Sequence, residues 1–394
     1  MRRVSILFVV AAMAAACAAD TGPVLTAPAT STPVPTATAA PTPTPTPIPE
    51  PPATATPVPT PTPAPTPTPI PDCLADVPLR TQLGQLMFPL AAPAELGLLD
   101  ALAAAREVSG VIVLGAPTLD QLAAIAGEDA GGVPLIVASD EEGGRVQRLG
   151  HLFGSLPSAQ QVAAGTPADA VDTFATYGRQ LAGAGVGMAI APVIDVGGGP
   201  GIGDRAFSTD PAVVAEYGAA VIEGYRSAGV IPVVKHFPGH GSASADSHLA
   251  FATTPPIETM REVDLLPYQQ LLDDGVPVLV GHLLVPGLTE DLPTSLSPAA
   301  IDGLLRGELG FGGVVITDAL GMNAVSNRWD NAEAARLAIT AGADLLVVDD
   351  PTLVVPVLDA LEAAVDAGTL DADHVRASVE RVLELKATDP CDMA

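Results

Sequence analysis

The fold is constrained most by eight short runs rich in valine, isoleucine and leucine, which alternate with longer amphipathic or alanine-rich stretches. The runs cover residues 84–90, 110–114, 133–138, 186–194, 230–234, 276–280, 313–317 and 343–348. Buried parallel strands separated by helices give this pattern. Eight such units in roughly 300 residues predict an α/β fold with a single (β/α)8 barrel of the TIM type, and an open doubly wound sheet is the alternative.

Charged or imidazole side chains stand at the C-terminal ends of most of these runs. They are Asp140, Asp195, Lys235, His236, His282, Asp318, Asp349 and Asp350. In a closed barrel the C-terminal strand ends converge on one face, where the active sites of this fold are built. Ordinary loop charges would have no reason to collect at these positions as a set. We therefore expect an enzyme whose site lies on that face.

The N-terminus has the pattern of an export signal. Arg2 and Arg3 precede a short apolar run that ends in Ala-Ala-Ala-Cys at Cys17. Residues 1–17 are therefore predicted to be a signal peptide with a lipobox-like end, although a lipobox usually carries leucine where this chain has Ala14. The alternatives are a cell-surface lipoprotein, lipidated on the cysteine, and a protein secreted after ordinary cleavage.

The segment 18–72 has a composition unlike that of the rest of the chain. It is rich in proline, threonine and alanine, and 19 of the 41 prolines fall between Pro23 and Pro71. Such a tract favours polyproline II and cannot form a packed core. We interpret it as a disordered linker that precedes one folded domain at residues 73–391.

The charge balance restricts the partners of the protein. There are 17 Lys and Arg residues against 45 Asp and Glu, so the formal net charge is -28. This balance argues against nucleic acid or an anionic membrane as a partner, because binding phosphates requires clustered positive charge. Membrane attachment is expected only through a lipid anchor, and the protein is expected to be a monomer.

Three cysteines are present, and lipidation would use Cys17. The other two, Cys73 and Cys391, lie just outside the two ends of the folded region. In an oxidising compartment they could form a disulfide, provided that the two termini meet in space. The spacing leaves both the bonded and the free states open.

Three of the six histidines fall within the segment 236–248. One explanation is a metal site in which His236, His240, His248 and His282 supply nitrogen ligands and Asp246 a carboxylate. Against it, the chain lacks a His-Glu-x-x-His helix, and the Pro238-Gly239 break prevents the first two histidines from sharing a helical face. We expect no metal and no cofactor.

Acid–base chemistry on a sugar is the other explanation. Asp246 and His248 are two positions apart, so on an extended segment both side chains point the same way and the carboxylate can orient the imidazole as a proton donor. Asp318, at a strand end, would be the nucleophile that attacks an acetal carbon. This pair would follow the two-role logic of retaining glycosidases, with histidine in place of one carboxylic acid. Spacing alone does not select this chemistry over others.

Four co-linear motifs resemble the β-N-acetylglucosaminidases of glycoside hydrolase family 3, the NagZ-like β-hexosaminidases. The resemblance extends from about Leu83 to Lys386. The motifs are Lys-His-Phe-Pro-Gly-His-Gly at 235–241 with Asp-Ser-His at 246–248, Asp-Glu-Glu-Gly-Gly-Arg-Val-Gln-Arg at 140–148, Ala-Pro-Val-Ile-Asp-Val at 191–196 with Asp-Arg-Ala-Phe-Ser at 204–208, and Ile-Thr-Asp-Ala-Leu-Gly-Met at 316–322.

The resemblance implies a barrel enzyme in which the nucleophile matches Asp318 and the acid/base matches His248, assisted by Asp246 on a mobile loop. The chain departs from the family where Ala319 replaces a second aspartate that many members carry. Asp318 is therefore the only nucleophile candidate in its motif. Arg145 matches an arginine that is either structural or adjacent to the sugar site.

The resemblance also implies a sugar pocket. Asp140, Arg205, Lys235 and His236 match positions that bind the hydroxyls of the terminal sugar. The expected activity is that of a retaining exo-β-N-acetylglucosaminidase acting on peptidoglycan or muropeptide fragments. The alternatives are a β-N-acetylglucosaminide phosphorylase, a β-glucosidase of the same family, and a non-catalytic sugar-binding lipoprotein. The last would be expected to lack Asp318 or His248, and both are present.

Overall fold

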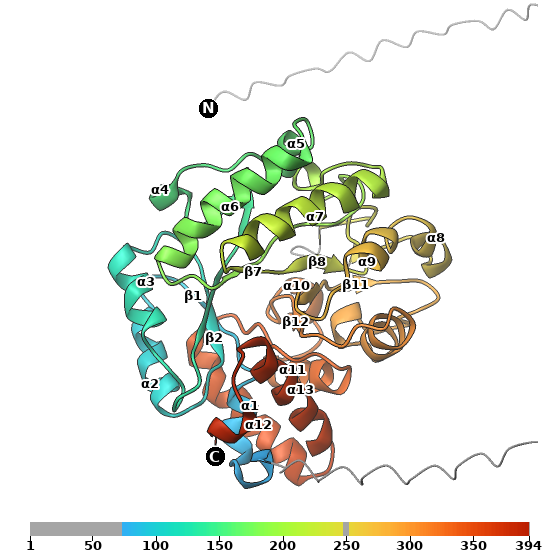
Figure 1. Cartoon of the computed structure of the whole chain (residues 1–394). Helices are drawn as coiled ribbons and strands as arrows, with labels where there is room; N and C mark the ends of the chain where they lie inside the picture. The colour runs from blue at the N-terminus through green and yellow to red at the C-terminus, as the bar shows by residue number, and fades with distance from the viewer. Residues whose placement is uncertain (1–72, 247–251, 394) are drawn as a thin grey trace, which may run out of the picture. The chain divides into compact units, whose positions relative to one another are not determined.

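The structure, a computed structural model, describes residues 73–246 and 252–393 (Figure 1). The predicted signal peptide, the predicted linker and the predicted proton donor His248 lie outside the described residues. Among the helices that are described, none has the length and apolar character needed to cross a bilayer.

The apolar runs form the central strands of an α/β fold. One parallel sheet has the order β1 (Leu90–Ala91), β2 (Gly110–Val113), β3 (Ile136–Ser139), β6 (Met188–Ala189) and β7 (Ile231–Pro232). A second has the order β12 (Val315–Thr317), β10 (Val278–Val280) and β8 (Val234–Phe237). Because only Val233 separates β7 from β8, the fifth run joins the two sheets.

The eighth run lies between the seventh run and the first. Leu345 bridges Ile316, and Leu346 bridges Met87, both in parallel orientation. The Leu90 amide donates to the Val348 carbonyl at 2.8 Å. Each of the eight runs therefore pairs with the next along the chain, and the last pairs with the first.

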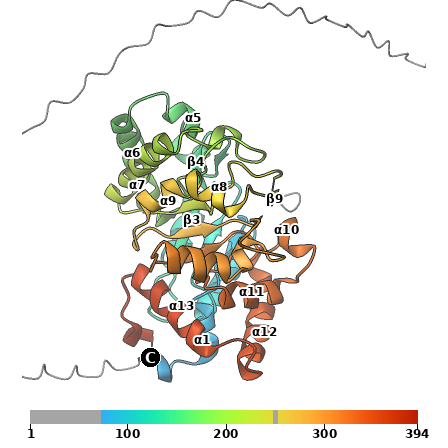
Figure 2. The same ribbon diagram turned by 90° about the vertical axis from the view of Figure 1, so that its right-hand side faces the viewer.

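Helices surround these strands in both views (Figures 1 and 2). They are α1 (Leu79–Gly84), α2 (Leu99–Ala104), α3 (Leu119–Ala126), α4 (Gly150–Phe153), α5 (Ala159–Val162), α6 (Pro167–Gly183), α7 (Pro211–Ser227), α8 (Ile257–Glu262), α9 (Leu266–Leu271), a π-helix (Ala299–Glu308), α10 (Asn323–Ser326), α11 (Asn331–Thr340), α12 (Val354–Asp366) and α13 (Ala372–Leu385). Two short pairs lie outside the central strands: β4 (Glu141–Gly143) with β5 (Val146–Gln147), and β9 (Ala252–Thr253) with β11 (Leu283–Leu284).

The two longest helices, α6 and α7, begin with proline at the first helical position, where no amide hydrogen is needed. Glycine lets them approach closely: a Cβ at Gly178 would lie 2.8 Å from the Ala228 Cβ, and one at Gly224 would lie 2.8 Å from the Phe174 Cβ. Phe174 packs edge-on against Tyr225 across this contact. These helices cover the strands that carry much of the site described below.

The boundaries of the first run differ from the prediction. We expected a strand over 84–90, but Gly84 is the last residue of α1 and the strand covers only Leu90–Ala91. A short buried helix and a buried strand give the same unbroken apolar run, so hydrophobicity cannot locate the boundary. A Cβ at Gly84 would overlap the Arg106 carbonyl, so the helix end packs directly on neighbouring backbone.

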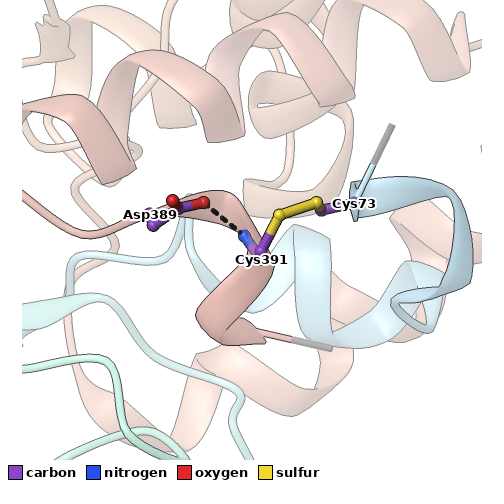
Figure 3. The surroundings of a disulfide bond; sticks show 3 residues. All are labelled: Cys73, Asp389 and Cys391. Atoms are coloured by element: carbon purple, nitrogen blue, oxygen red, sulfur yellow. Dashed lines mark hydrogen bonds between the residues drawn. A yellow bond between two sulfur atoms is a disulfide. The ribbon is translucent and has the colours of Figure 1, made fainter. Parts of the chain in front are cut away.

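The two ends of the described chain are joined by a disulfide between Cys73 and Cys391, whose Cα atoms are 4.8 Å apart (Figure 3). The bonded state that the sequence left open is therefore the one observed. The Arg106 guanidinium also donates to the Met393 carbonyl. Because Arg106 shortly precedes β2, the joined termini lie at the N-terminal ends of the strands.

Candidate active site

A cavity of about 290 Å³ lies at the C-terminal ends of the central strands. Its polar wall is formed by Asp140, Arg148, Lys235, His236, Asp318 and Asp349. Its apolar wall includes Leu90, Ile112, Leu114, Ile190, Leu279, Met322 and Val347. Five of the strand-end residues singled out in the sequence therefore meet in one cavity, as the convergence of strand ends predicts.

Lys235 is the cation at the centre of the polar wall. Its ammonium group lies 2.8 Å from Asp140 Oδ1 and 2.6 Å from Glu142 Oε1, and its side chain is only 4% exposed. Burial by itself would lower the pKa of Lys235, but the two carboxylates raise it above the usual value. The lysine is therefore held charged, and it ties the ends of β3 and β8 together.

Asp140 stands at the start of a tight hairpin that brings Arg148 back beside it. Gly143 and Gly144 have φ values of 94° and 58°, the left-handed region in which glycine is favoured. The turn lets the Arg148 amide donate to the Asp140 carbonyl at 3.1 Å, while its guanidinium lies 3.3 Å from the Asp140 carboxylate. Burial would raise the pKa of Asp140, but Lys235 and Arg148 lower it to about 2, so it is a carboxylate.

Arg205 lies behind the cavity wall. Its guanidinium makes a two-pronged ion pair with Glu142, with Nε to Oε2 at 2.7 Å and Nη2 to Oε1 at 2.8 Å. Nη2 also lies 3.2 Å from His236 Nε2. Burial opposes the charge of Glu142, but Lys235 and Arg205 lower its pKa below the ordinary value. Asp140, Lys235, Glu142, Arg205 and His236 thus form one connected network.

Asp195 extends the network on the other side of His236. Asp195 Oδ2 lies 2.7 Å from His236 Nδ1, and Oδ1 accepts the backbone amides of His236 at 3.2 Å and His240 at 2.7 Å. The residue is 1% exposed. Burial would raise the pKa of Asp195, but the hydrogen bonds that it accepts from His236 and from the His240 amide lower it below the ordinary value.

Asp318 follows β12 and faces the cavity together with Asp349, from the end of the eighth run. Its Oδ1 accepts the Ala319 amide at 2.9 Å, and its own amide donates to the Val280 carbonyl at 3.0 Å. Buried His282 supports this turn from behind, because its Nε2 donates to the Ala319 carbonyl at 2.8 Å. The arrangement fixes the backbone from which the carboxylate extends.

Asp246 lies beside the connection from β6 to α7, where a Cβ on Gly201 would contact its carboxylate. Arg145 donates to the Gly201 carbonyl and pairs with Asp204 in the same region. The predicted partner of Asp246, His248, lies outside the described residues.

Two members of the network, Glu142 and Arg148, were missed by sequence reasoning as functional residues, and Asp195 was singled out at a strand end without a role. Glu142, Arg148 and Asp195 all fall inside motifs on which the family resemblance rests. The signal that could have found them was the clustering of charge within those motifs. Among the described residues, no group of three or more His, Cys, Asp or Glu side chains is arranged to hold a metal ion.

Comparisons with known proteins find relatives of this chain. A model of the glycosyl hydrolase family 3 N-terminal domain matches residues 99–385. The chain is 45% identical over 272 residues to "Beta-hexosaminidase LpqI" of Mycobacterium tuberculosis, covering 66% of this chain and 70% of that protein.

Solved structures show the same relationship. A glycosyl hydrolase family 3 member from Mycobacterium smegmatis is 41% identical with a TM-score of 0.74, over 79% of this chain and 98% of that one. A family 3 β-N-acetylglucosaminidase from Paenibacillus sp. is 34% identical with a TM-score of 0.74, over 79% of this chain and 62% of that one. The chain therefore belongs to glycosyl hydrolase family 3.

Proposed function

We propose that this protein is a retaining exo-β-N-acetylglucosaminidase that removes terminal N-acetylglucosamine from peptidoglycan or muropeptide fragments. The names of its relatives support the sugar: β-hexosaminidase for the mycobacterial protein and β-N-acetylglucosaminidase for the Paenibacillus enzyme. The predicted export signal and linker suit a cell-wall substrate.

One observation carries the proposal. Asp318 and the charged network of Asp140, Arg148 and Lys235 line the same cavity, whose volume of about 290 Å³ suits a single amino sugar. One wall offers donors and acceptors for hydroxyls, and another offers a carboxylate for the anomeric carbon. A cavity of this kind favours attack at the end of a glycan rather than at its middle.

In the first step, the Asp318 carboxylate attacks the anomeric carbon while the His248 imidazolium gives its proton to the departing oxygen. The glycosidic bond breaks and an ester bond to Asp318 forms. Asp246 orients the imidazole and favours its protonated form. In the second step, His248 takes a proton from water, the water attacks the anomeric carbon, and Asp318 leaves with net retention of configuration.

The proposed sugar ligands divide into two groups. Asp140 and Lys235 line the cavity and would exchange hydrogen bonds with the hydroxyls, with Arg148 as a further donor. His236 also lines the cavity. Arg205 would donate to a hydroxyl beside His236 while its guanidinium stays paired with Glu142. A sugar that lacks one of these hydroxyls would leave a buried polar group unpaired, which discriminates strongly against it.

We extend the proposal to the fold and the location. The pairing of every run with the next, and of the last with the first, supports a closed (β/α)8 barrel with the cavity at its C-terminal face.

We propose an exported, monomeric lipoprotein anchored through Cys17. Mass spectrometry of the N-terminal peptide from native membranes should find a lipid on this cysteine, and an unmodified N-terminus would refute the anchor.

The test of the activity is turnover of 4-nitrophenyl N-acetyl-β-glucosaminide by the wild type, Asp318→Asn and a matched control. Asp350→Asn is suited as the control because Asp350 neighbours cavity-lining Asp349, yet its own side chain accepts the Thr352 amide. We expect Asp318→Asn to lower kcat at least about 10³-fold and Asp350→Asn to stay close to the wild type. Full activity of Asp318→Asn would refute the mechanism.

Products from purified muropeptides define the substrate. We expect free N-acetylglucosamine as the only sugar released, with the β-anomer formed first. Repeating the reaction with inorganic phosphate separates hydrolysis from phosphorolysis. Accumulation of N-acetylglucosamine 1-phosphate would replace the proposed hydrolase by the phosphorylase alternative.

A further inference from the structure

Asp195 uses both of its carboxylate oxygens on one short segment of the chain. Oδ2 lies 2.7 Å from the His236 ring nitrogen Nδ1, while Oδ1 accepts the backbone amides of His236 and His240. Asp195 is 1% exposed, so water does not compete for these contacts. The carboxylate comes from the end of the fourth run and holds the segment that follows the fifth.

The other side of the His236 ring fixes its protonation. Arg205 Nη2 lies 3.2 Å from His236 Nε2. A guanidinium can only donate hydrogen bonds, so Nε2 has to be the acceptor and carries no hydrogen. The hydrogen is then on Nδ1, which donates to Asp195. A neutral ring with its hydrogen on Nδ1 satisfies both contacts.

Arg205 is itself held in place. Its two-pronged pair with Glu142 orients the guanidinium, and Glu142 also receives the Lys235 ammonium at 2.6 Å. The side chains of Glu142 and Arg205 are 4% and 10% exposed. The donor at Nε2 is thus held by an ion pair with a buried glutamate, and the acceptor at Nδ1 is held by two backbone amides.

We propose that Asp195 is a positioning residue that locks His236 as the neutral Nδ1–H tautomer and anchors the segment 236–240, from which the chain continues to Asp246 and His248. No role for Asp195 follows from the nucleophile, the proton donor or the sugar ligands. The kinetic part of this inference rests on the proposed function, whereas the tautomer of His236 does not. Asp195 acts on the sugar and on the proton donor only through the residues that it holds.

The substitution Asp195→Asn separates the tautomer from the packing. An asparagine side chain has nearly the same shape, and its oxygen can still accept the two backbone amides. Its amide nitrogen, however, is a donor and would face Nδ1, which favours a hydrogen on Nε2 instead. That hydrogen would oppose the Arg205 guanidinium. We therefore expect His236 to change its tautomer and the Arg205 contact to weaken.

The direct measurement is the 15N spectrum of the histidine side chains of the full chain at neutral pH, with the His236 signals assigned by their loss in His236→Gln. In the wild type, we expect Nδ1 to have the shift of a protonated nitrogen and Nε2 that of an unprotonated one. In Asp195→Asn, we expect the two shifts to exchange. A wild-type ring with its hydrogen on Nε2, or an Asp195→Asn spectrum equal to the wild type, would overturn the inference.

Kinetics provide the second readout, with Asp210→Asn as the control. Asp210 caps α7 at the end of the same connection, and asparagine caps helices equally well. We expect Asp195→Asn to lower kcat/KM about 10- to 100-fold. The loss should be larger for a substrate with an alkyl leaving group than for one with a 4-nitrophenyl leaving group. The reason is that a misplaced proton donor matters most when the leaving group needs a proton. Equal losses for both leaving groups would refute the anchoring part.

The two proposals fail separately. If the wild type did not release N-acetylglucosamine, the proposed function would fall, but the 15N spectrum would still decide the tautomer. If the wild type were active and its spectrum showed the other tautomer, the inference on Asp195 would fall while the proposed function stood.

Discussion

The Lys235 ammonium lies 2.8 Å from the Asp140 carboxylate, and this ion pair joins residues 95 positions apart at the ends of two central strands. The same ammonium reaches Glu142 at 2.6 Å. One buried cation is therefore shared by two carboxylates, of which Asp140 lines the cavity. The pair is both a part of the proposed sugar site and a link that holds the strand ends together.

Replacing Lys235 with methionine should damage stability and binding together. The change removes the cation that buried Glu142 shares with Asp140, and breaking a buried pair in this way costs about 3–5 kcal/mol. We expect this loss in urea denaturation at pH 7, and an increase in KM larger than the change in kcat. Lys386→Met is the control, since Lys386 is a partly buried lysine bonded to Gln85 and the Ser109 carbonyl rather than to a carboxylate. Equal losses in the two variants would contradict the account.

Asp264 should make stability depend on pH. It is 2% exposed and lies under Gly239, and burial together with the charge of Asp195 raises its pKa from 3.8 to about 7. A raised pKa means that the folded state binds the proton more tightly than the unfolded state, so this stabilisation is complete below pH 4 and is lost as pH rises to about 7. Asp264→Asn removes this loss of stability, because asparagine does not titrate. The Tm of the variant relative to wild type should therefore increase between these pH values, whereas a constant difference would show that Asp264 is not the group responsible.

The disulfide should contribute to stability and little to activity. It closes a loop of 318 residues, and constraining so long a loop in the unfolded chain is worth roughly 3–5 kcal/mol. We expect Cys73→Ser, Cys391→Ser and the double variant to lose similar amounts of stability, measured by chemical denaturation. Because the bond lies at the strand ends opposite the cavity, kcat/KM should stay within about twofold of the wild type. A large loss of activity at full folding would contradict this placement.

Gly321 should be required for the shape of the cavity. A Cβ at this position would overlap the Asp349 carboxylate, which lines the same cavity. Gly321→Ala should therefore displace Asp349 and raise KM at least about tenfold. If the cause is this overlap, adding Asp349→Ala should recover part of the loss. If the increase in KM of the double variant equalled the product of the increases in the two single variants, the cause would be another one.

Local sequence patterns predicted the central strands and the residues at their ends, because burial of parallel strands demands apolar runs and the ends of such strands share one face. The sequence could not separate α1 from β1 within residues 84–90, since both are apolar and buried there. It also left the disulfide open, because its formation depended on where the two termini of the domain lie.

The connections inside the site required the structure. Arg205 meets Glu142 across 63 positions and Asp195 meets His236 across 41, and neither distance in sequence indicates a contact in space. Arg205 was expected to bind sugar. Its two-pronged ion pair with buried Glu142 gives it a structural role as well.

The most direct test of the central claim is to trap the glycosyl–enzyme and identify the bonded residue. A 5-fluoro analogue of N-acetyl-β-glucosaminyl fluoride slows both steps through its ring fluorine, while its reactive fluoride favours formation over hydrolysis of the intermediate. After proteolysis, mass spectrometry should locate one sugar on the peptide that contains Asp318, and Asp318→Asn should acquire none. A sugar bonded to any other residue of the wild type would contradict the account.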